Sequence, residues 1–182
     1  MKIIVINGQG GSGKDTFVGY CGYEDDGIFN FSMVDKIKIA AEDLGWTGTK
    51  TPKDRKFLSD LKDLAANYND CPFRSTLNKI QEAVKRYKVY HSNGDKNVVV
   101  FVHSREPKDI QRWVEDYGAK TLLILRSDIE NEFGNHADDE VFDFNYDYMV
   151  DNDKDLNYFR WCAKEFIDMI KNEEWESDIW KK

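Results

Sequence analysis

A glycine-rich segment near the start of the chain has the residue types that bind a phosphate. Residues 8–14 are Gly-Gln-Gly-Gly-Ser-Gly-Lys and fit the pattern G-x-x-x-x-G-K. Glycines let the backbone curl so that successive N–H groups face an anion, and the lysine adds a mobile cation for the β and γ phosphates. We therefore expect ATP to bind along this loop and the start of the next helix, at Gly8, Gln9, Gly10, Gly11, Ser12, Gly13, Lys14, Asp15 and Thr16.

The two residues after the loop indicate how a metal ion is held. The usual pattern has Ser or Thr directly after the lysine, where its hydroxyl meets Mg²⁺. Here Asp15 stands at that position and Thr16 follows it. A carboxylate is itself a hard oxygen ligand for Mg²⁺, directly or through a water molecule. We therefore expect ATP and Mg²⁺ as cofactors, with Asp15 and Thr16 placing the metal.

The loop stands between a predicted strand and a predicted helix, which is the context that the pattern requires. Residues 2–7 (KIIVIN) are rich in β-branched residues and typical of a strand buried on both faces. Runs of the same kinds predict further strands at 27–32, 97–102, 121–125 and 147–150, and helices over 13–20, 34–44, from 52, from 72, over 107–118 and from 156. Strands that alternate with helices predict an α/β fold with a parallel sheet covered on both faces.

One connection between the predicted strands differs from the others. Residues 33–95, between the second and third strands, have helical patterns throughout. An all-helical connection of this length is unusual and predicts a helical subdomain inserted between two strands of the sheet. Residues 126–143 are polar, acidic and without periodicity, which is typical of a loop.

The bulk composition limits the class of protein. The chain has 182 residues, 41% hydrophobic and 33% charged, which is typical of one globular domain. Its net charge of −8 disfavours binding to duplex nucleic acid, which needs a basic face. No stretch has the length of a membrane span or the pattern of a signal peptide. Three widely spaced cysteines without a C-x-x-C pair predict reduced thiols in a cytoplasmic protein: Cys21, Cys71 and Cys162.

Several cations are expected at the carboxyl edge of the sheet, where open parallel sheets bind ligands. Arg105 lies just past the third predicted strand, and Arg126 ends the fourth. Lys36 and Lys38 follow the second strand. Cations that converge on a transferred phosphoryl group and an acceptor phosphate favour a kinase, because phosphoryl transfer depends mostly on positioning and charge neutralisation.

Other classes that use such a loop lack their signatures here. There is no N-K-x-D sequence to bind guanine, and the third strand ends Val102-His103-Ser104 without the carboxylate that motor ATPases usually place there. Arg55 and Lys62 are two helical turns apart and share a face of an inserted helix, which adds cations to the kinase interpretation. Of the three histidines, His103 has the best case for function, since it lies at the strand edge near the arginine.

The string Gly13-Lys14-Asp15-Thr16 resembles the phosphate loop of the deoxynucleoside monophosphate kinases of the phage and bacterial type. The related phosphomevalonate kinases look similar there. Two late segments also resemble that family: residues 136–140 are similar to its H-x-S-E stretch, and residues 147–153 to its last strand, D-x-x-I-x-N-D.

Residues 102–109 (VHSREPKD) resemble the D-x-R-x-P-x-E segment that follows the third strand of that family. Arg105 and Pro107 match, and Asp109 stands where the family has an acid. The chain departs from the family at the Asp before the arginine, because His103 and the serine after it occupy that place.

The resemblance implies a three-layer α/β/α fold of the adenylate-kinase-like P-loop type, with a five-stranded parallel sheet in the order 2-3-1-4-5. It implies one domain over 1–182, with a helical insert at about 33–95 that binds the monophosphate and a short lid at about 127–140. The implied reaction is ATP-dependent phosphoryl transfer to a (deoxy)nucleoside monophosphate. The implied catalytic residues are Lys14, Arg105 and Arg126. The acceptor side is implied to use Ser32, Lys36, Lys38, Arg55, Arg105 and Asp109, with Asp109 orienting an arginine.

Two alternatives stay open. The chain is also compatible with a kinase for a non-nucleotide phosphate such as phosphomevalonate. It is further compatible with a nucleotide-binding module that has lost turnover, because residues 127–140 hold no arginine that a closing lid would bring to the phosphates. Expected partners are small-molecule nucleotides, without nucleic acid or membrane, for either a monomer or a homodimer.

Overall fold

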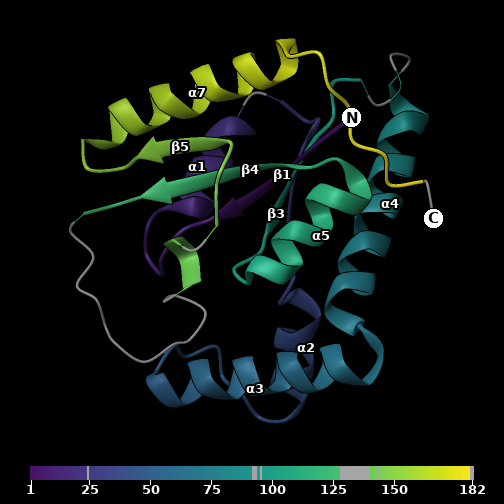
Figure 1. Ribbon diagram of the computed structural model, residues 1–182, viewed down its shortest axis with the longest axis vertical. Coiled ribbons are helices and arrows are strands. Elements are labelled where there is room, and N and C mark those ends of the chain that lie inside the picture. Colours follow the sequence, from purple (N-terminus) through teal and green to yellow (C-terminus); the bar gives the residue numbers. More distant parts are fainter. Residues whose placement is uncertain (24, 92–93, 95, 128–139, 143, 181–182) are drawn as a thin grey trace.

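A five-stranded sheet is the centre of the computed structural model, which describes residues 1–23, 25–91, 94, 96–127, 140–142 and 144–180 (Figure 1). Its strands are β1 (Lys2–Asn7), β2 (Ile28–Ser32), β3 (Val99–His103), β4 (Lys120–Leu125) and β5 (Tyr148–Asp151). All pairings are parallel and the order is β2-β3-β1-β4-β5. The predicted α/β class and the 2-3-1-4-5 order are therefore confirmed.

The helices lie on both faces of this sheet and beside it (Figure 1). They are α1 (Lys14–Cys21), α2 (Asp35–Asp43), α3 (Pro52–Asn69), α4 (Cys71–Tyr90), α5 (Pro107–Tyr117) and α7 (Leu156–Asn172), with a 3₁₀ turn η1 (Glu140–Phe142). Short polar signals set several boundaries. At the start of α3, for example, Thr51 Oγ1 accepts from Asp54 N and the Asp54 carboxylate accepts from Thr51 N, with Pro52 as the first helical residue.

The central strands are apolar on both faces because helices cover both. Ile4 and Ile6 of β1 pack with α1 and α7, where the rings of Phe17 and Phe166 lie 5.6 Å apart. Ile3 and Val5 point to the other face and pack against α4 and α5. The large side chains that complete this second cluster are Phe73, Ile80, Ile110, Trp113 and Tyr117.

The predicted all-helical connection between the second and third strands contains α2, α3 and α4. These three helices differ in how they are buried. α4 contributes Phe73, Ile80 and Val84 to the core beneath the sheet, whereas the one buried residue of α3 is a lysine, Lys62. In Figure 1, α3 lies away from the strands, at the lower end of the molecule. The connection therefore combines α4, which covers one face of the sheet, with α3, which lies farther from the strands.

β3 differs from its prediction in its bounds. It was expected over 97–102 and runs over Val99–His103. The register decides this, because Ile6 of β1 and Ser32 of β2 both pair with His103. His103 is thus the last residue of the strand itself, and its side-chain direction is fixed by the pleat.

The opposite, amino edge of the sheet is closed by the segment after α7. Ser177 N donates to Met1 O at 3.0 Å, and the Ser177 hydroxyl accepts from Ile3 N at 2.9 Å, so the segment after α7 passes beside the start of β1 (Figure 1). None of the helices in the described ranges has the length and apolarity that crossing a membrane requires. The three cysteines are unpaired, as expected for reduced thiols.

Candidate functional site

The loop of residues 8–13 joins β1 to α1 at the carboxyl edge of the sheet, and Lys14 folds back across it. The Lys14 ammonium lies 2.5 Å from Gly8 O, 2.8 Å from Gln9 O and 3.3 Å from Ser12 Oγ. Its positive charge is thereby held over the loop and not extended into solvent. This placement is what a cation for a bound phosphate needs.

Two glycines give the loop its shape because no other residue fits. Gly8 has φ 147°, and a Cβ there would lie 2.5 Å from Ile124 O of β4. Gly13 has φ 98°, and a Cβ there would lie 2.6 Å from Asn152 Nδ2. That same amide donates to Ser12 O at 2.8 Å, so the segment after β5 holds the loop in place. The loop is therefore a rigid element packed against two neighbouring strands.

Several backbone amides of the loop are available to an anion. The N–H groups of Gly10, Gly11 and Gly13 donate no hydrogen bond to any residue that the structure describes. Gly13 also caps α1 without a side-chain hydrogen bond, and the start of a helix carries a partial positive charge on its first N–H groups. Loop amides, a helix start and a lysine together form an arrangement suited to phosphate.

Asp15 and Thr16 lie on the first turn of α1, and both are exposed. The Asp15 side chain is 92% exposed, so its carboxylate can reach a metal bound to phosphates above the loop. Within the described ranges, no three His, Cys, Asp or Glu side chains gather to hold a metal by themselves. One carboxylate and one hydroxyl fit Mg²⁺, which is usually bound through one or two carboxylates together with substrate phosphates and water.

His103 lies beside Asp15, with its Nε2 3.6 Å from Asp15 Oδ1. That nitrogen is shielded from solvent and makes no hydrogen bond with the described residues. Burial lowers the pKa of His103 to about 4; the Asp15 charge opposes this shift and the Lys14 charge adds to it. The imidazole is therefore neutral at pH 7. Asp35 and Lys38 of α2 are also near enough for their charges to act on the ring.

Arg105 follows β3, and its backbone is tied to the end of β1. Asn7 Nδ2 donates to Arg105 O at 3.3 Å and to the Tyr146 hydroxyl at 2.7 Å. Tyr146 in turn donates to Val141 O at 2.8 Å, which attaches η1 to the same network. Burial raises the pKa of Tyr146 to about 12, so this hydroxyl stays protonated. The network fixes where the arginine leaves the sheet.

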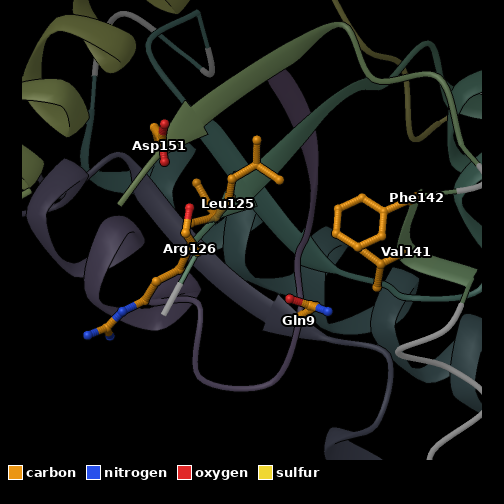
Figure 2. A pocket seen from close by; sticks show the side chains of 8 residues that line it. Gln9, Leu125, Arg126, Val141, Phe142 and Asp151 are labelled. Carbon is orange, nitrogen blue, oxygen red and sulfur yellow. The ribbon is translucent and has the colours of Figure 1, made fainter. Parts of the chain in front are cut away.

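Arg126 follows β4 and borders a cavity of about 330 Å³. Figure 2 shows Arg126 and Asp151 on one side, Val141 and Phe142 on the other, and Gln9 of the loop between them. The cavity thus lies between Gln9 of the glycine-rich loop and the ends of β4 and β5.

The other residues predicted for the acceptor side lie on β2, α2, α3 and α5. Ser32 ends β2 next to His103 in the sheet register, and its N–H donates to Asp35 Oδ2 at 3.2 Å. Lys36 and Lys38 are exposed on α2, and Arg55 is half-buried on α3. The sheet register brings Ser32 to the carboxyl edge. Lys38 also lies near that edge, because its charge acts on the pKa of His103. The predicted lid segment lies almost wholly outside the described residues, since positions 128–139 are among those the structure leaves out.

Lys62 and Asp109 form a contact that the sequence did not indicate. Lys62 is only 8% exposed, and its ammonium pairs with Asp109 Oδ2 at 2.8 Å and with the Glu106 carboxylate. Lys62 was expected to add a cation beside Arg55 on one helical face; the structure pairs its ammonium with two carboxylates, which neutralise its charge. The described contact of Asp109 is likewise with this lysine, where an arginine was expected.

Burial acts to raise the pKa of Glu106, but the hydrogen bond and charge of Lys62 outweigh it and hold the pKa below its usual value. Glu106 stays ionised and directly follows Arg105 in the chain. We refer to Lys62, Glu106 and Asp109 as the α3 ion-pair cluster. It fastens α3 to the segment that carries the arginine.

Sequence reasoning missed four side chains that hold the site together: Asn7, Glu106, Tyr146 and Asn152. Two of them had a weak signal. An asparagine directly before the first glycine and another just after the last strand are polar residues at strand ends, where a loop needs hydrogen-bond partners. The other two gave no local signal.

Comparison with known families finds no family model that matches the chain, and no curated protein matches it. The protein is therefore described by its fold and by the geometry of its site. It is an α/β protein with an all-parallel sheet in the order 2-3-1-4-5 and a glycine-rich loop after its central strand.

Proposed function

We propose that this protein is an ATP-dependent phosphotransferase that acts on a (deoxy)nucleoside monophosphate and forms the diphosphate. The observation that carries the proposal is the Lys14 ammonium over the glycine loop, at the same sheet edge from which Arg105 and Arg126 leave. The phosphoryl donor and the cations that act on it would then lie at the carboxyl edge of the sheet. This is the edge where open parallel sheets bind ligands.

The loop residues 8–16 bind the donor. Free amides of the loop and the start of α1 hold the β and γ phosphates, and Lys14 moves from the carbonyl oxygens of Gly8 and Gln9 to the phosphate oxygens. Asp15 and Thr16 would hold Mg²⁺. Bound there, Mg²⁺ would neutralise charge on the phosphates of the donor.

The transfer joins an oxygen of the acceptor phosphate to the γ phosphorus, while the bond from that phosphorus to the bridging oxygen of ADP breaks. Arg105 and Arg126 neutralise the moving phosphoryl group and the acceptor phosphate. The acceptor is further held by side chains of β2, α2, α3 and α5, namely Ser32, Lys36, Lys38, Arg55 and Asp109. Asp109 then acts through the α3 ion-pair cluster, since its described partner is Lys62.

The test is release of ADP from Mg-ATP with a panel of ribo- and deoxynucleoside monophosphates, alongside calorimetric measurement of ATP binding. We expect ATP to bind and at least one monophosphate to raise ADP release far above the rate with water alone. ATP binding without any acceptor-dependent release would sink the proposal and identify a binding module instead. Release only with a non-nucleotide phosphate such as phosphomevalonate would reassign the acceptor class.

A further inference from the structure

His103 contains a polar atom that the fold buries without satisfying. Its Nε2 is shielded from solvent and makes no hydrogen bond to the residues described. A buried nitrogen without a partner carries an uncompensated loss of hydration. Such groups are uncommon in folded proteins and call for an explanation.

The sheet register explains where this nitrogen points. His103 pairs with Ile6 of β1, so both side chains lie on the same face of the sheet. Ile6 belongs to the cluster that packs against α1 and includes Phe17. His103 therefore points to the α1 side, at the end of the strand, where the first turn of α1 carries Asp15. Its Nε2 lies 3.6 Å from Asp15 Oδ1.

We propose that His103 is a positioning residue for magnesium, whose Nε2–H donates to Asp15 Oδ1 and so leaves Oδ2 directed at the Mg²⁺ of bound Mg-ATP. The inference rests on the proposed function, because it needs ATP on the loop. In this proposal, His103 does not contact the metal and affects it through the Asp15 carboxylate.

The geometry supports this role from both sides of the contact. The Asp15 side chain is 92% exposed, so a turn about its side-chain bonds is enough to shorten 3.6 Å to hydrogen-bond length. An exposed carboxylate with no partner samples several rotamers, and a fixed donor on one oxygen restricts it to one. Metal-ligating carboxylates are typically hydrogen-bonded in this way, and loss of the outer partner usually weakens metal affinity.

The first experiment reads the imidazole directly. Nitrogen-15 NMR of the wild-type protein records Nδ1 and Nε2 of its three histidines with ATP alone and with Mg-ATP, and a His103→Gln variant assigns the signals. We expect Nε2 of His103 to carry the proton with Mg-ATP, and its signal to shift when Mg²⁺ is added. A ring that carries its proton on Nδ1 only cannot donate from Nε2 and would overturn the proposal.

The second experiment measures Mg²⁺ affinity of the ATP complex by calorimetry. His103→Phe keeps the ring volume and removes the donor, and we expect it to weaken Mg²⁺ binding about tenfold while metal-free ATP binds within about twofold of wild type. His103→Gln keeps a donor and should retain most of the affinity. His91→Phe, the same change at the far end of α4, is the matched control and should leave Mg²⁺ affinity unchanged.

A double-mutant cycle then shows whether His103 acts through Asp15. In an Asp15→Asn background, His103→Phe should change Mg²⁺ affinity less than twofold. A full tenfold effect in that background, or no effect of His103→Phe in the wild type, would overturn the inference. If His103→Phe does not fold, the NMR experiment on the wild type still decides.

Failure of this inference and failure of the proposed function have different signatures. If ATP does not bind, both are wrong. If Mg-ATP binds but no acceptor is phosphorylated, the proposed function fails while the Mg²⁺ measurements on His103 still decide the inference. If transfer occurs and the Mg²⁺ measurements show no role for His103, only the inference fails.

Discussion

Two regions near the same edge of the sheet each hold a lysine, Lys14 in the glycine loop and Lys62 on α3. They differ in the groups that contact the lysine ammonium. The Lys14 ammonium contacts two carbonyl oxygens and a hydroxyl of its own loop, which are neutral acceptors. The Lys62 ammonium contacts two carboxylates, Glu106 and Asp109, which neutralise it. A lysine on neutral acceptors can exchange them for an anion, whereas one between carboxylates is already paired. Under the proposed function, Lys14 is a binding cation and Lys62 is a structural one.

The largest expected effect comes from removing the binding cation. We expect Lys14→Met to lower kcat/KM for ATP by at least about 100-fold, because a charge aimed at the transferred phosphoryl group is lost. The melting temperature should change little, since its partners are neutral oxygens. Steady-state kinetics and a thermal melt measure this. Lys56→Met, an exposed lysine of α3 paired with Asp60, is the matched control and should preserve kcat/KM. A Lys14 variant with near wild-type kinetics would contradict the comparison.

Removing the structural cation should give the opposite pattern. We expect Lys62→Met to lower the free energy of unfolding by about 3 kcal/mol, because two mostly buried carboxylates lose their partner. ATP affinity should stay within a few-fold of wild type, since the described partners of Lys62 are Glu106 and Asp109 and not residues of the loop. Urea denaturation and calorimetry measure the two quantities.

A triple variant that also carries Glu106→Gln and Asp109→Asn should recover part of the lost stability, because no unpaired carboxylate remains. Equal stability of the single variant and the Lys56→Met control would show that the α3 ion-pair cluster is not structural.

The rigidity of the binding region is tested by two glycines with similar backbone angles. Gly13 has φ 98° and Gly11 has φ 86°, but a Cβ at Gly13 would meet Asn152 at 2.6 Å, whereas a Cβ at Gly11 has nothing within 4 Å. Both alanine variants carry backbone strain of about 1 kcal/mol. We expect Gly13→Ala to cost about 1–2 kcal/mol more than Gly11→Ala, and to weaken ATP binding more. Similar unfolding free energies for both would mean that the loop moves away from Asn152 easily.

The smallest expected effect is a pH dependence of the structural region. Lys62 holds the pKa of Glu106 below its usual value in the folded protein. The stability that this contributes is present above the unfolded pKa, about 4.3, and is lost as pH falls through the lower folded pKa. Unfolding free energies of the wild type and Glu106→Gln should therefore converge as the pH falls below the unfolded pKa and through the folded one. A constant difference between them from pH 7 to pH 3 would contradict this.

The strands and helices were predictable because their signals are local. The apolar runs of β1, β3 and β4 and the helical spacing of α4 and α7 lie within single segments, and each predicted element is present near its expected bounds. The loop of residues 8–13 followed from glycine spacing and from its place between a strand and a helix. The predicted ATP, Mg²⁺ and acceptor roles stay predictions.

The partners of charged and polar side chains were not predictable, because they come from distant segments. Asn152 and Ser12 are 140 positions apart, and Lys62 is 44 positions from Glu106. A helical face that carries Arg55 and Lys62 looks the same in sequence whether it faces phosphate or carboxylates. Only the packing of α3 against the start of α5 decides which.

The sequence by itself determined that a glycine loop with a lysine follows a buried strand, since backbone conformation depends on the residues that adopt it. The tertiary structure alone decided that Lys14 contacts oxygens of its own loop while Lys62 pairs with two carboxylates, and that His103 Nε2 lies beside Asp15. The physical reason is that the charge compensation and burial of a side chain depend on the residues that contact it. That is set by the sheet register and the helix packing, which join residues far apart in the chain.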